Sequence, residues 1–295
     1  MYNAIEDNKR KTVIIMVLFL ALIGGLGWLF STLYGNGEPS ITVGVLIGGL
    51  IYVLISYFIS SKLMLAMNGA KPIEKRDNPR LYRIVENLSI TNGMPMPKIY
   101  LTEDRAANAF ATGRNPENAV VGATTGLLDI LDDSELEGVM AHEMGHVKNY
   151  DIRVSLVAFA MVAVIGLLAD IMLRMSWFGG GDDDDGGSNQ ILFILSIAAA
   201  ILAPLVATLI QLAISRQREY LADATGALTT RYPEALASAL EKISQNGSAL
   251  KRQNRSTAHL FFANPLKRST FSALFSTHPP IEERVSRLRS IATKA

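Results

Sequence analysis

The chain has 295 residues, of which 49% are hydrophobic, and its mean hydropathy is +0.24. These values are typical of a membrane protein. A formal net charge of +1 supplies no large basic excess to neutralise phosphates, which argues against nucleic acid as a partner. There are no cysteines, which excludes disulfides and thiolate metal ligands, and any metal site must use His, Asp or Glu.

Two long apolar runs open the chain. Residues 12–34 contain no charged side chain and are long enough to cross about 30 Å of hydrocarbon. A second apolar run, residues 41–60, follows a short turn. The basic residues 9–11 would also suit a signal peptide, but the first run is too long and lacks a small-x-small cleavage site. We therefore predict an N-terminal transmembrane hairpin.

A soluble-looking segment follows the hairpin. Asn78 before Pro79 predicts the start of a helix, and Gly93 predicts its end. Residues 132–134 offer N-cap candidates for a second helix, which no proline interrupts. Short β-strands are expected between the two helices, at residues 98–101, 105–112 and 119–123.

The second of these helices carries the motif His142-Glu143-Met144-Gly145-His146. Two histidines four residues apart share one face of a helix, so their imidazoles can bind one metal ion. Glu143 points toward the same side, where its carboxylate can take a proton from an activated water and pass it to a leaving amine. This is the H-E-x-x-H pattern of zinc peptidases. The alternative is a surface helix with two solvated or packed histidines.

Two further apolar runs, residues 154–175 and 191–214, predict a second transmembrane hairpin. Between them, residues 179–187 form a glycine-flanked run of four aspartates, which we interpret as a solvated connector rather than a calcium loop. A buried helical pair in a soluble core is the alternative for these two runs.

The distribution of basic residues predicts the orientation of the four spans. If every run crosses, one side carries most of the flanking Lys and Arg, and the opposite loops carry Glu38 and the aspartate run, with Arg174 as the exception. The residues on the basic side are Lys9, Arg10, Lys11, Lys62, Lys148, Arg153, Arg216 and Arg218. Both termini and the soluble segments are therefore expected in the cytoplasm.

Glu219 and Asp223, just after the fourth run, are four residues apart and share a helix face. Two histidines and a carboxylate form the open ligand set of a catalytic zinc, and Glu219 could complete it. Asp223 could then accept the spare N–H of a ligand imidazole. From the residues alone, Glu219 suits a surface ion pair with Arg216 or Arg218 equally well.

Four blocks of the sequence belong together: His142-Glu143-Met144-Gly145-His146, Glu219-Tyr220-Leu221-Ala222-Asp223, Asn108-Ala109-Phe110 and Thr277-His278-Pro279-Pro280. On these blocks, and over nearly its whole length, the chain resembles the HtpX-type membrane zinc metalloproteases, relatives of the CAAX prenyl proteases. The resemblance implies zinc on His142, His146 and Glu219, with Glu143 as the general base, and a role in membrane-protein quality control under stress. We infer nothing from it for the acidic residues 182–185.

The resemblance also draws attention to Asn108, Ala109 and Phe110. They lie in a short, weakly alternating segment, as an edge strand beside a protease cleft would. An extended substrate could add to such a strand through backbone hydrogen bonds, which give affinity with little sequence preference. An ordinary sheet edge is the alternative.

His278 and Arg284 are candidates for a further catalytic role. Peptide hydrolysis develops negative charge on the carbonyl oxygen, and either side chain could donate a hydrogen bond to it, as the family pattern suggests. Capping, or surface pairing with Glu282 or Glu283, is the alternative.

The predicted fold is a mainly α membrane protein with four transmembrane helices and a split, cytoplasmic, zincin-like α+β catalytic domain that contains a small β-sheet. Residues 1–61 and 154–214 form the hairpins, and residues 62–153 and 215–295 form the catalytic domain. The predicted activity is zinc-dependent endopeptidase cleavage of polypeptides, chiefly misfolded or damaged membrane proteins, at the cytoplasmic surface of the cell membrane.

This activity has two alternatives, an intramembrane protease and an inactive binding protein. An intramembrane protease would carry its motif inside an apolar run, whereas residues 132–153 hold many charged side chains. A catalytically inactive membrane scaffold or chaperone-like adaptor would have no need of the general base Glu143.

Overall fold

The computed structural model describes most of the chain outside the third and fourth apolar runs. The described residues are 2–34, 37–157, 161, 194, 198, 216–246, 261, 262 and 279–292. The contacts divide the chain into two compact units. The first comprises Met1–Lys9, Ser61–Leu156 and Leu212–Ala295, and the second comprises Arg10–Ser60 and Val157–Gln211. Residues 179–187, with their aspartate run, lie outside the described residues, so the prediction of a solvated connector stays a prediction.

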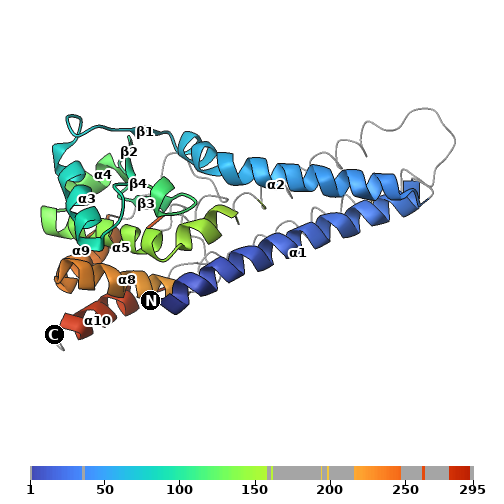
Figure 1. Cartoon of the computed structure of the whole chain (residues 1–295). Coiled ribbons are helices and arrows are strands. Elements are labelled where there is room, and N and C mark those ends of the chain that lie inside the picture. Colours follow the sequence, from blue (N-terminus) through green and yellow to red (C-terminus); the bar gives the residue numbers. More distant parts are fainter. Residues whose placement is uncertain are drawn as a thin grey trace. The chain divides into compact units, whose positions relative to one another are not determined.

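Both N-terminal apolar runs are helical and extend beyond the predicted limits (Figure 1). Helix α1 covers Tyr2–Tyr34, and helix α2 covers Pro39–Met67. Small residues let the two helices touch, because a Cβ added at Gly27 would lie only 2.9 Å from the Val45 side chain. Many large apolar side chains on both helices are nevertheless exposed, including Val17, Trp28 and Phe58.

By length and composition, no single helix of the described residues is suited to cross a bilayer. Two consecutive segments, Pro39–Ile55 and Tyr57–Met67, satisfy these criteria together and meet at a bend of 55°.

The first unit contains a mixed four-stranded sheet in the order β1-β2-β4-β3. Strands β2 and β4 are parallel, and the other two pairs are antiparallel. The strands are β1 (Ala70–Pro72), β2 (Lys98–Thr102), β3 (Ala109–Thr112) and β4 (Val120–Thr124). Of the predicted strand at 105–112 only the second half is extended, because Asp104 and Thr124 hold residues 104–108 in a loop through side-chain hydrogen bonds. The three-residue β1 was too short to be detected from the sequence.

Both predicted helices of this unit are confirmed, with their caps. Helix α3 (Pro79–Asn92) begins where the Asn78 side chain accepts a hydrogen bond from the Leu81 N–H, and it ends at Gly93, whose φ of 63° is left-handed. A short helix, α4 (Thr125–Ile130), follows β4. Helix α5 (Asp133–Lys148) begins with a capping box between Asp132 and Glu135.

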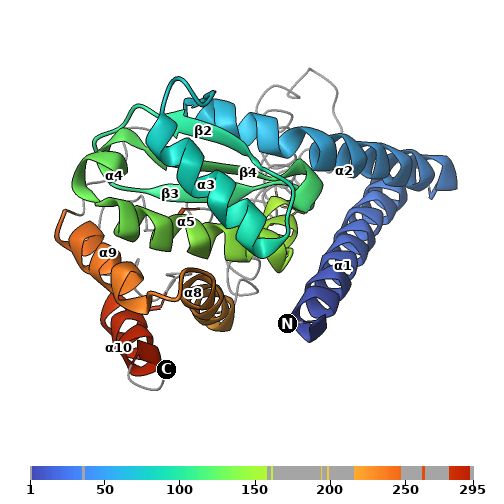
Figure 2. The same ribbon diagram turned by 60° about the vertical axis from the view of Figure 1, so that its left-hand side comes forward.

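Helix α5 is the centre of the unit, since it is covered on nearly every side (Figure 2). It packs against β3, β4 and α3 on one side and against α8 (Arg216–Thr230) and α9 (Pro233–Gln245) on another. Helix α10 (Ile281–Ala292) packs on α8 and α9.

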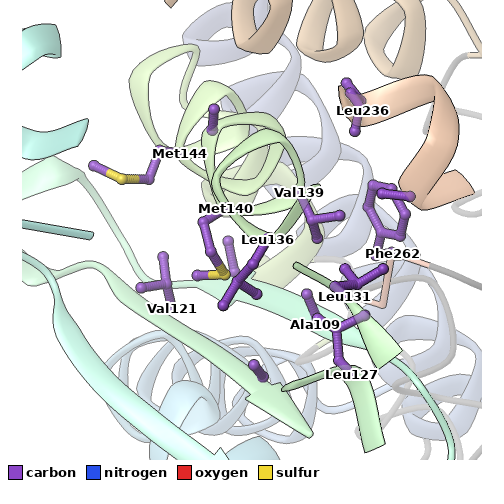
Figure 3. Close-up of a cluster of buried hydrophobic side chains, with 14 of the residues drawn as sticks. Ala109, Val121, Leu127, Leu131, Leu136, Val139, Met140, Met144, Leu236 and Phe262 are labelled. Carbon is purple, nitrogen blue, oxygen red and sulfur yellow. The ribbon is translucent and has the colours of Figure 1, made fainter. Parts of the chain in front are cut away.

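Apolar side chains fill the space around α5 (Figure 3). Met140 and Leu136 face Val121 of the sheet, while Val139 faces Leu236 of α9, and these five side chains are fully buried. Burial of each such side chain is worth about 1.5–3 kcal/mol. This packing fixes the position of the helix that carries the motif.

Candidate metal centre and active site

Helices α5 and α8 bring His142, His146 and Glu219 together. One ligand atom from each lies within 4.8 Å of the others. The two Nε2 atoms are 3.1 Å apart, and the Glu219 carboxylate oxygens lie 3.7 Å from Nε2 of His142 and 3.4 Å from Nε2 of His146. His142 and Glu219 are buried, and His146 is partly exposed. One cation could therefore contact all three side chains.

The meeting of α5 and α8 depends on small residues at their contact. A Cβ added at Gly226 of α8 would lie 3.0 Å from the backbone nitrogen of His142, closer than such atoms normally approach. At Gly145 of α5, an added Cβ would make ordinary contacts of 3.5 Å with Ala222 and Thr225. The close backbone approach brings Glu219, two turns before Gly226, within reach of both histidines.

On each histidine, the ring nitrogen that faces away from the common point lies beside a carboxylate. Nδ1 of His142 lies 2.9 Å from Asp223 Oδ1, and Nδ1 of His146 lies 2.9 Å from Asp151 Oδ2. When each imidazole is neutral with its proton on Nδ1, that N–H donates to the carboxylate and the lone pair of Nε2 is directed at the common point. Sequence reasoning suggested Asp223 in this position but missed Asp151. The signal available for Asp151 was an acidic residue just beyond the end of the motif helix.

Arg284 of α10 is 1% exposed and forms two hydrogen bonds to Asp223. Its Nε donates to Oδ2 at 2.9 Å, and its Nη2 donates to Oδ1 at 2.7 Å. Nη1 lies 3.8 Å from Glu219, and the guanidinium lies 4.9 Å from the ring centroid of Phe262. The structure thus places Arg284 at the site, where it binds the carboxylate that supports His142.

The pKa values of the two histidines are shifted in opposite directions. Burial lowers the pKa of His142 to about 4, although its hydrogen bond to Asp223 works against this shift. Burial also acts to lower the pKa of His146, but Glu219 and Asp151 outweigh it and raise that pKa well above its ordinary value.

The pKa values of the Glu143 and Asp223 carboxyl groups are also shifted in opposite directions. Burial raises the pKa of Glu143 to about 8, and the nearby Glu219 adds to the effect. Burial also acts to raise the pKa of Asp223, but Arg284 and His142 outweigh it and hold that pKa at about 2. Asp223 is therefore an anion near neutral pH, whereas the ionisation of Glu143 depends on the charge around it.

The donor set and its charge fit a divalent cation. Among the described residues, the site gathers four buried carboxylates, namely Glu143, Asp151, Glu219 and Asp223. Two buried guanidinium groups, those of Arg218 and Arg284, face them. With all four carboxylates ionised and both imidazoles neutral, the state in which these groups can bind a metal, two negative charges remain, which a divalent cation would balance. Two imidazoles and one carboxylate are also the ligands of catalytic zinc.

The edge strand β3 lies beside the site and already has a partner. The Phe262 N–H donates to the Ala109 carbonyl at 2.9 Å, and Phe261 forms an antiparallel bridge with Phe110. The Phe262 ring meets the His142 ring edge-on at 5.0 Å. Asn108 is buried, and its side chain accepts a hydrogen bond from the Ala109 N–H. Sequence reasoning did not connect residues 261–262 with this strand, and no local pattern marks the pairing.

His278 lies outside the described residues, so its predicted role is neither supported nor opposed by the geometry. Arg218, which sequence reasoning treated as a surface residue, is buried, with Nη1 3.5 Å from Asp151 Oδ1. It sits one position before Glu219 on α8, and its proximity to Asp151 follows from the meeting of the two helices.

Comparison with known proteins shows the family of the chain. Residues 75–292 match the sequence profile of peptidase family M48. The chain is 52% identical over 294 residues to a protease HtpX homolog of Tropheryma whipplei (strain Twist), covering 100% of this chain and 99% of that protein. It is 46% identical over 296 residues to a protease HtpX homolog of Dictyoglomus turgidum, covering 99% of this chain and 95% of that protein.

Among solved structures, the chain is similar to the crystal structure of S. mikatae Ste24p, with a TM-score of 0.52 and 24% sequence identity. The similarity covers 94% of this chain but 65% of the Ste24p chain, and it concerns the fold alone. The predicted resemblance to HtpX-type proteases is confirmed by the relatives, and the mostly helical fold with a small sheet is confirmed by the structure. Because the family profile covers most of the chain and includes His142, His146 and Glu219, this protein belongs to peptidase family M48 and is a metalloprotease.

Proposed function

We propose that the protein is a membrane-embedded zinc endopeptidase that hydrolyses internal peptide bonds of misfolded or damaged membrane proteins at the cytoplasmic membrane surface. Its role would be protein quality control under stress. The observation that carries the proposal is the convergence of His142, His146 and Glu219, with Asp223 and Asp151 behind the two histidines. A binding module would need neither this ligand set nor the buried carboxyl group of Glu143.

The residues have separate tasks in this mechanism. His142, His146 and Glu219 would hold the metal. When bound, zinc supplies a Lewis acid that polarises the scissile carbonyl, lowers the pKa of water and, by its charge, favours ionised Glu143. Glu143 takes a proton from the attacking water on a carboxylate oxygen and delivers it to the nitrogen of the leaving amine.

Arg284 and His278 were both candidates to stabilise negative charge on the carbonyl oxygen. Because two hydrogen bonds tie Arg284 to Asp223, we assign it to holding that carboxylate and to balancing the charge of Glu219. His278 remains our candidate donor to the carbonyl oxygen.

The membrane part of the proposal rests on the apolar runs. We assign residues 1–61 and 154–214 to two transmembrane hairpins and residues 62–153 and 215–295 to the catalytic domain. Support comes from the apolar side chains that α1 and α2 expose, which water would disfavour and lipid would accept. The basic residues near the ends of the runs support a cytoplasmic location for both termini and the active site.

The experiment that tests the activity compares wild-type protein with Glu143→Gln, both purified in detergent. We expect equal zinc content in the two proteins, and a fall of about 10²–10⁴-fold in cleavage of casein and of a membrane-protein substrate in the variant, because a positioned base contributes that much. Chelator should abolish wild-type cleavage. The matched control is Glu137→Gln, the same substitution on the same helix, which should cleave normally.

Cleavage that persists in Glu143→Gln would remove the base assignment. A wild-type protein that binds zinc but cleaves nothing would favour the inactive scaffold or chaperone-like adaptor. Reporter fusions within residues 182–185 would test the topology, since the proposal places this loop on the side opposite the active site.

Substrate would bind as an extended strand along Asn108, Ala109 and Phe110, at the start of β3, in competition with residues 261–262. The hydrogen bond from Phe262 to Ala109 supports this, because the backbone of this edge already has one partner beside His142. Phe261→Ala removes a ring contact with Phe110 that has a centroid distance of 5.8 Å. Such contacts are worth about 0.5–1.5 kcal/mol, so the KM for a long peptide should fall about two- to tenfold. An unchanged KM would oppose the competition.

A further inference from the structure

The turn that follows helix α5 leads to Asp151, whose carboxylate lies beside Nδ1 of His146. The turn consists of Asn149 and Tyr150, Asp151 is the first residue of the helical segment 151–157, and Tyr150 adopts a left-handed backbone conformation with φ of 62°. A non-glycine residue in that conformation persists only where the surroundings hold it. The position of Asp151 therefore depends on what contacts the turn.

The N-terminal end of the chain provides those contacts. The two N–H groups of the Asn8 side-chain amide have two acceptors, the Asp151 Oδ1 at 2.7 Å and the Asn149 carbonyl at 2.9 Å. All three residues are buried, with Asn8 only 3% exposed. The next residue, Lys9, places its ammonium 4.9 Å from the ring centroid of Tyr150. Two consecutive residues, Asn8 and Lys9, thus contact both turn residues and Asp151.

We propose that Asn8 is a positioning residue of the metal centre, which acts through Asp151 to fix the orientation of His146. The inference rests on the proposed metal site. Asp151 uses Oδ2 for His146 and Oδ1 for Asn8, so the amide determines how the carboxylate plane is turned. The Nδ1–H of His146 then points at Oδ2, and its Nε2 points at the ligand position.

The other ligand histidine offers a comparison. Asp223, behind His142, is carried within helix α8 and held by two hydrogen bonds from Arg284. Asp151 lies beyond the end of α5, and its Oδ1 is 3.5 Å from Arg218 in addition to the Asn8 contact. Each of the two carboxylates is thus held by a different group. The Arg284 guanidinium holds Asp223, and mainly the neutral amide of Asn8 holds Asp151.

The identity of residue 8 matters for charge. An amide donates to a carboxylate without adding charge to a site that already gathers four acidic groups. A carboxylate in place of Asn8 would face Asp151 across 2.7 Å and repel it. Helix α1 therefore carries, ahead of its apolar stretch, a group on which the geometry of a metal ligand depends.

The test measures the dissociation constant for Zn²⁺ alone, by competition with a chelating dye, on full-length protein in detergent. We expect about tenfold weaker binding for Asn8→Ala and about 10–100-fold weaker binding for Asn8→Asp, the range seen when partners of ligand histidines are lost. The matched control is Asp7→Asn, which changes the charge of the exposed neighbouring residue and should leave the affinity unchanged.

A swap distinguishes positioning from general support of the fold. In Asn8→Asp combined with Asp151→Asn, the amide and the carboxylate exchange places, and the amide oxygen at position 151 can still accept from His146. We expect the swap to bind Zn²⁺ more tightly than Asn8→Asp alone. The visible spectrum of the Co²⁺-substituted protein should shift in both Asn8 variants and return toward wild type in the swap.

Equal affinities and spectra in wild type and both Asn8 variants, even with lower melting temperatures, would overturn the inference and leave Asn8 a structural residue. If Asn8→Asp does not accumulate as folded protein, Asn8→Ser replaces it, because its hydroxyl is too short to span both acceptors. A wild-type protein that binds no Zn²⁺ would overturn the proposed function, and this inference with it.

Discussion

The side chains of the metal centre owe their properties to their immediate partners. His142 and His146 have the same chemistry, yet one has a lowered pKa because it is buried and the other a raised pKa because Glu219 and Asp151 surround it. Each can offer a lone pair to a metal only because a carboxylate accepts the proton on its other nitrogen. The partners of the ligands therefore matter nearly as much as the ligands themselves.

Asp223→Asn tests this dependence at one residue. The amide can still accept from His142, but it removes the negative charge that Arg284 faces in a buried position. We expect Zn²⁺ affinity to fall about 10–100-fold and the unfolding free energy to fall by about 3–5 kcal/mol, because the buried guanidinium loses its hydrogen-bonded counter-charge and keeps only the more distant Glu219. Chelator competition and thermal unfolding in detergent measure the two effects. Glu283→Gln, which alters an exposed pair with Arg287, is the control, and equal losses in both variants would contradict the expectation.

Helix α5 is packed against other elements on almost every side, and its metal-ligand side chains must still face α8. Its first turn is joined to α9 through Glu135. One Glu135 oxygen accepts from Ser238 at 2.6 Å, and the other accepts from Lys242 at 2.7 Å. The same carboxylate caps the helix by accepting from the Asp132 N–H at 2.9 Å. A single acidic side chain thus anchors the start of the motif helix.

Glu135→Gln tests this anchor through its pH dependence. Burial acts to raise the pKa of Glu135, but Lys242 and Ser238 outweigh it and lower that pKa. Stabilisation by the ionised carboxylate is therefore present above the pKa of an unfolded glutamate and is lost as pH falls through the lower folded pKa. We expect Glu135→Gln to be about 1–2 kcal/mol less stable near neutral pH, with the difference disappearing at strongly acid pH. Thermal unfolding across this pH range measures it, and a constant difference would exclude the electrostatic explanation.

At the scale of the whole molecule, the first unit is assembled from three separate stretches of chain. Met1–Lys9 supplies Asn8, Ser61–Leu156 supplies the sheet and α5, and Leu212–Ala295 supplies α8, α9 and α10. A metal bound by His142, His146 and Glu219 would link two of these stretches across more than 70 residues. Metal binding should therefore stabilise the assembled unit as well as support catalysis.

Removal of the metal tests this link without an activity assay. Chelator should lower the melting temperature of the detergent-purified protein, and each tenfold rise in free Zn²⁺ above the dissociation constant should add about 1.4 kcal/mol to its stability. His146→Ala, which removes one ligand, should melt at a temperature that no longer depends on Zn²⁺. A melting temperature of wild-type protein that is the same with chelator and with Zn²⁺ would show that the metal does not join the two stretches.

The sequence by itself determined the features that depend on local chemistry. The caps at Asn78, Gly93 and Asp132 predicted helix limits, because capping involves residues only a few positions apart. The spacing of His142 and His146 predicted a metal site, because four residues along a helix return to the same face. Glu219 remained ambiguous from the residues alone, and the resemblance to a family, not its spacing, favoured it as a ligand.

Only the tertiary structure decided which distant residues support the site. Asp151 follows α5 in sequence, but its hydrogen bond to His146 depends on a left-handed turn that no sequence pattern signalled. Asn8, 143 residues away from Asp151, reaches it through the packing of a separate stretch of chain. The pairing of Phe262 with β3 has the same origin. Such contacts join groups that are far apart in sequence. Which of these groups meet is decided by apolar packing across the whole fold and not by local periodicity.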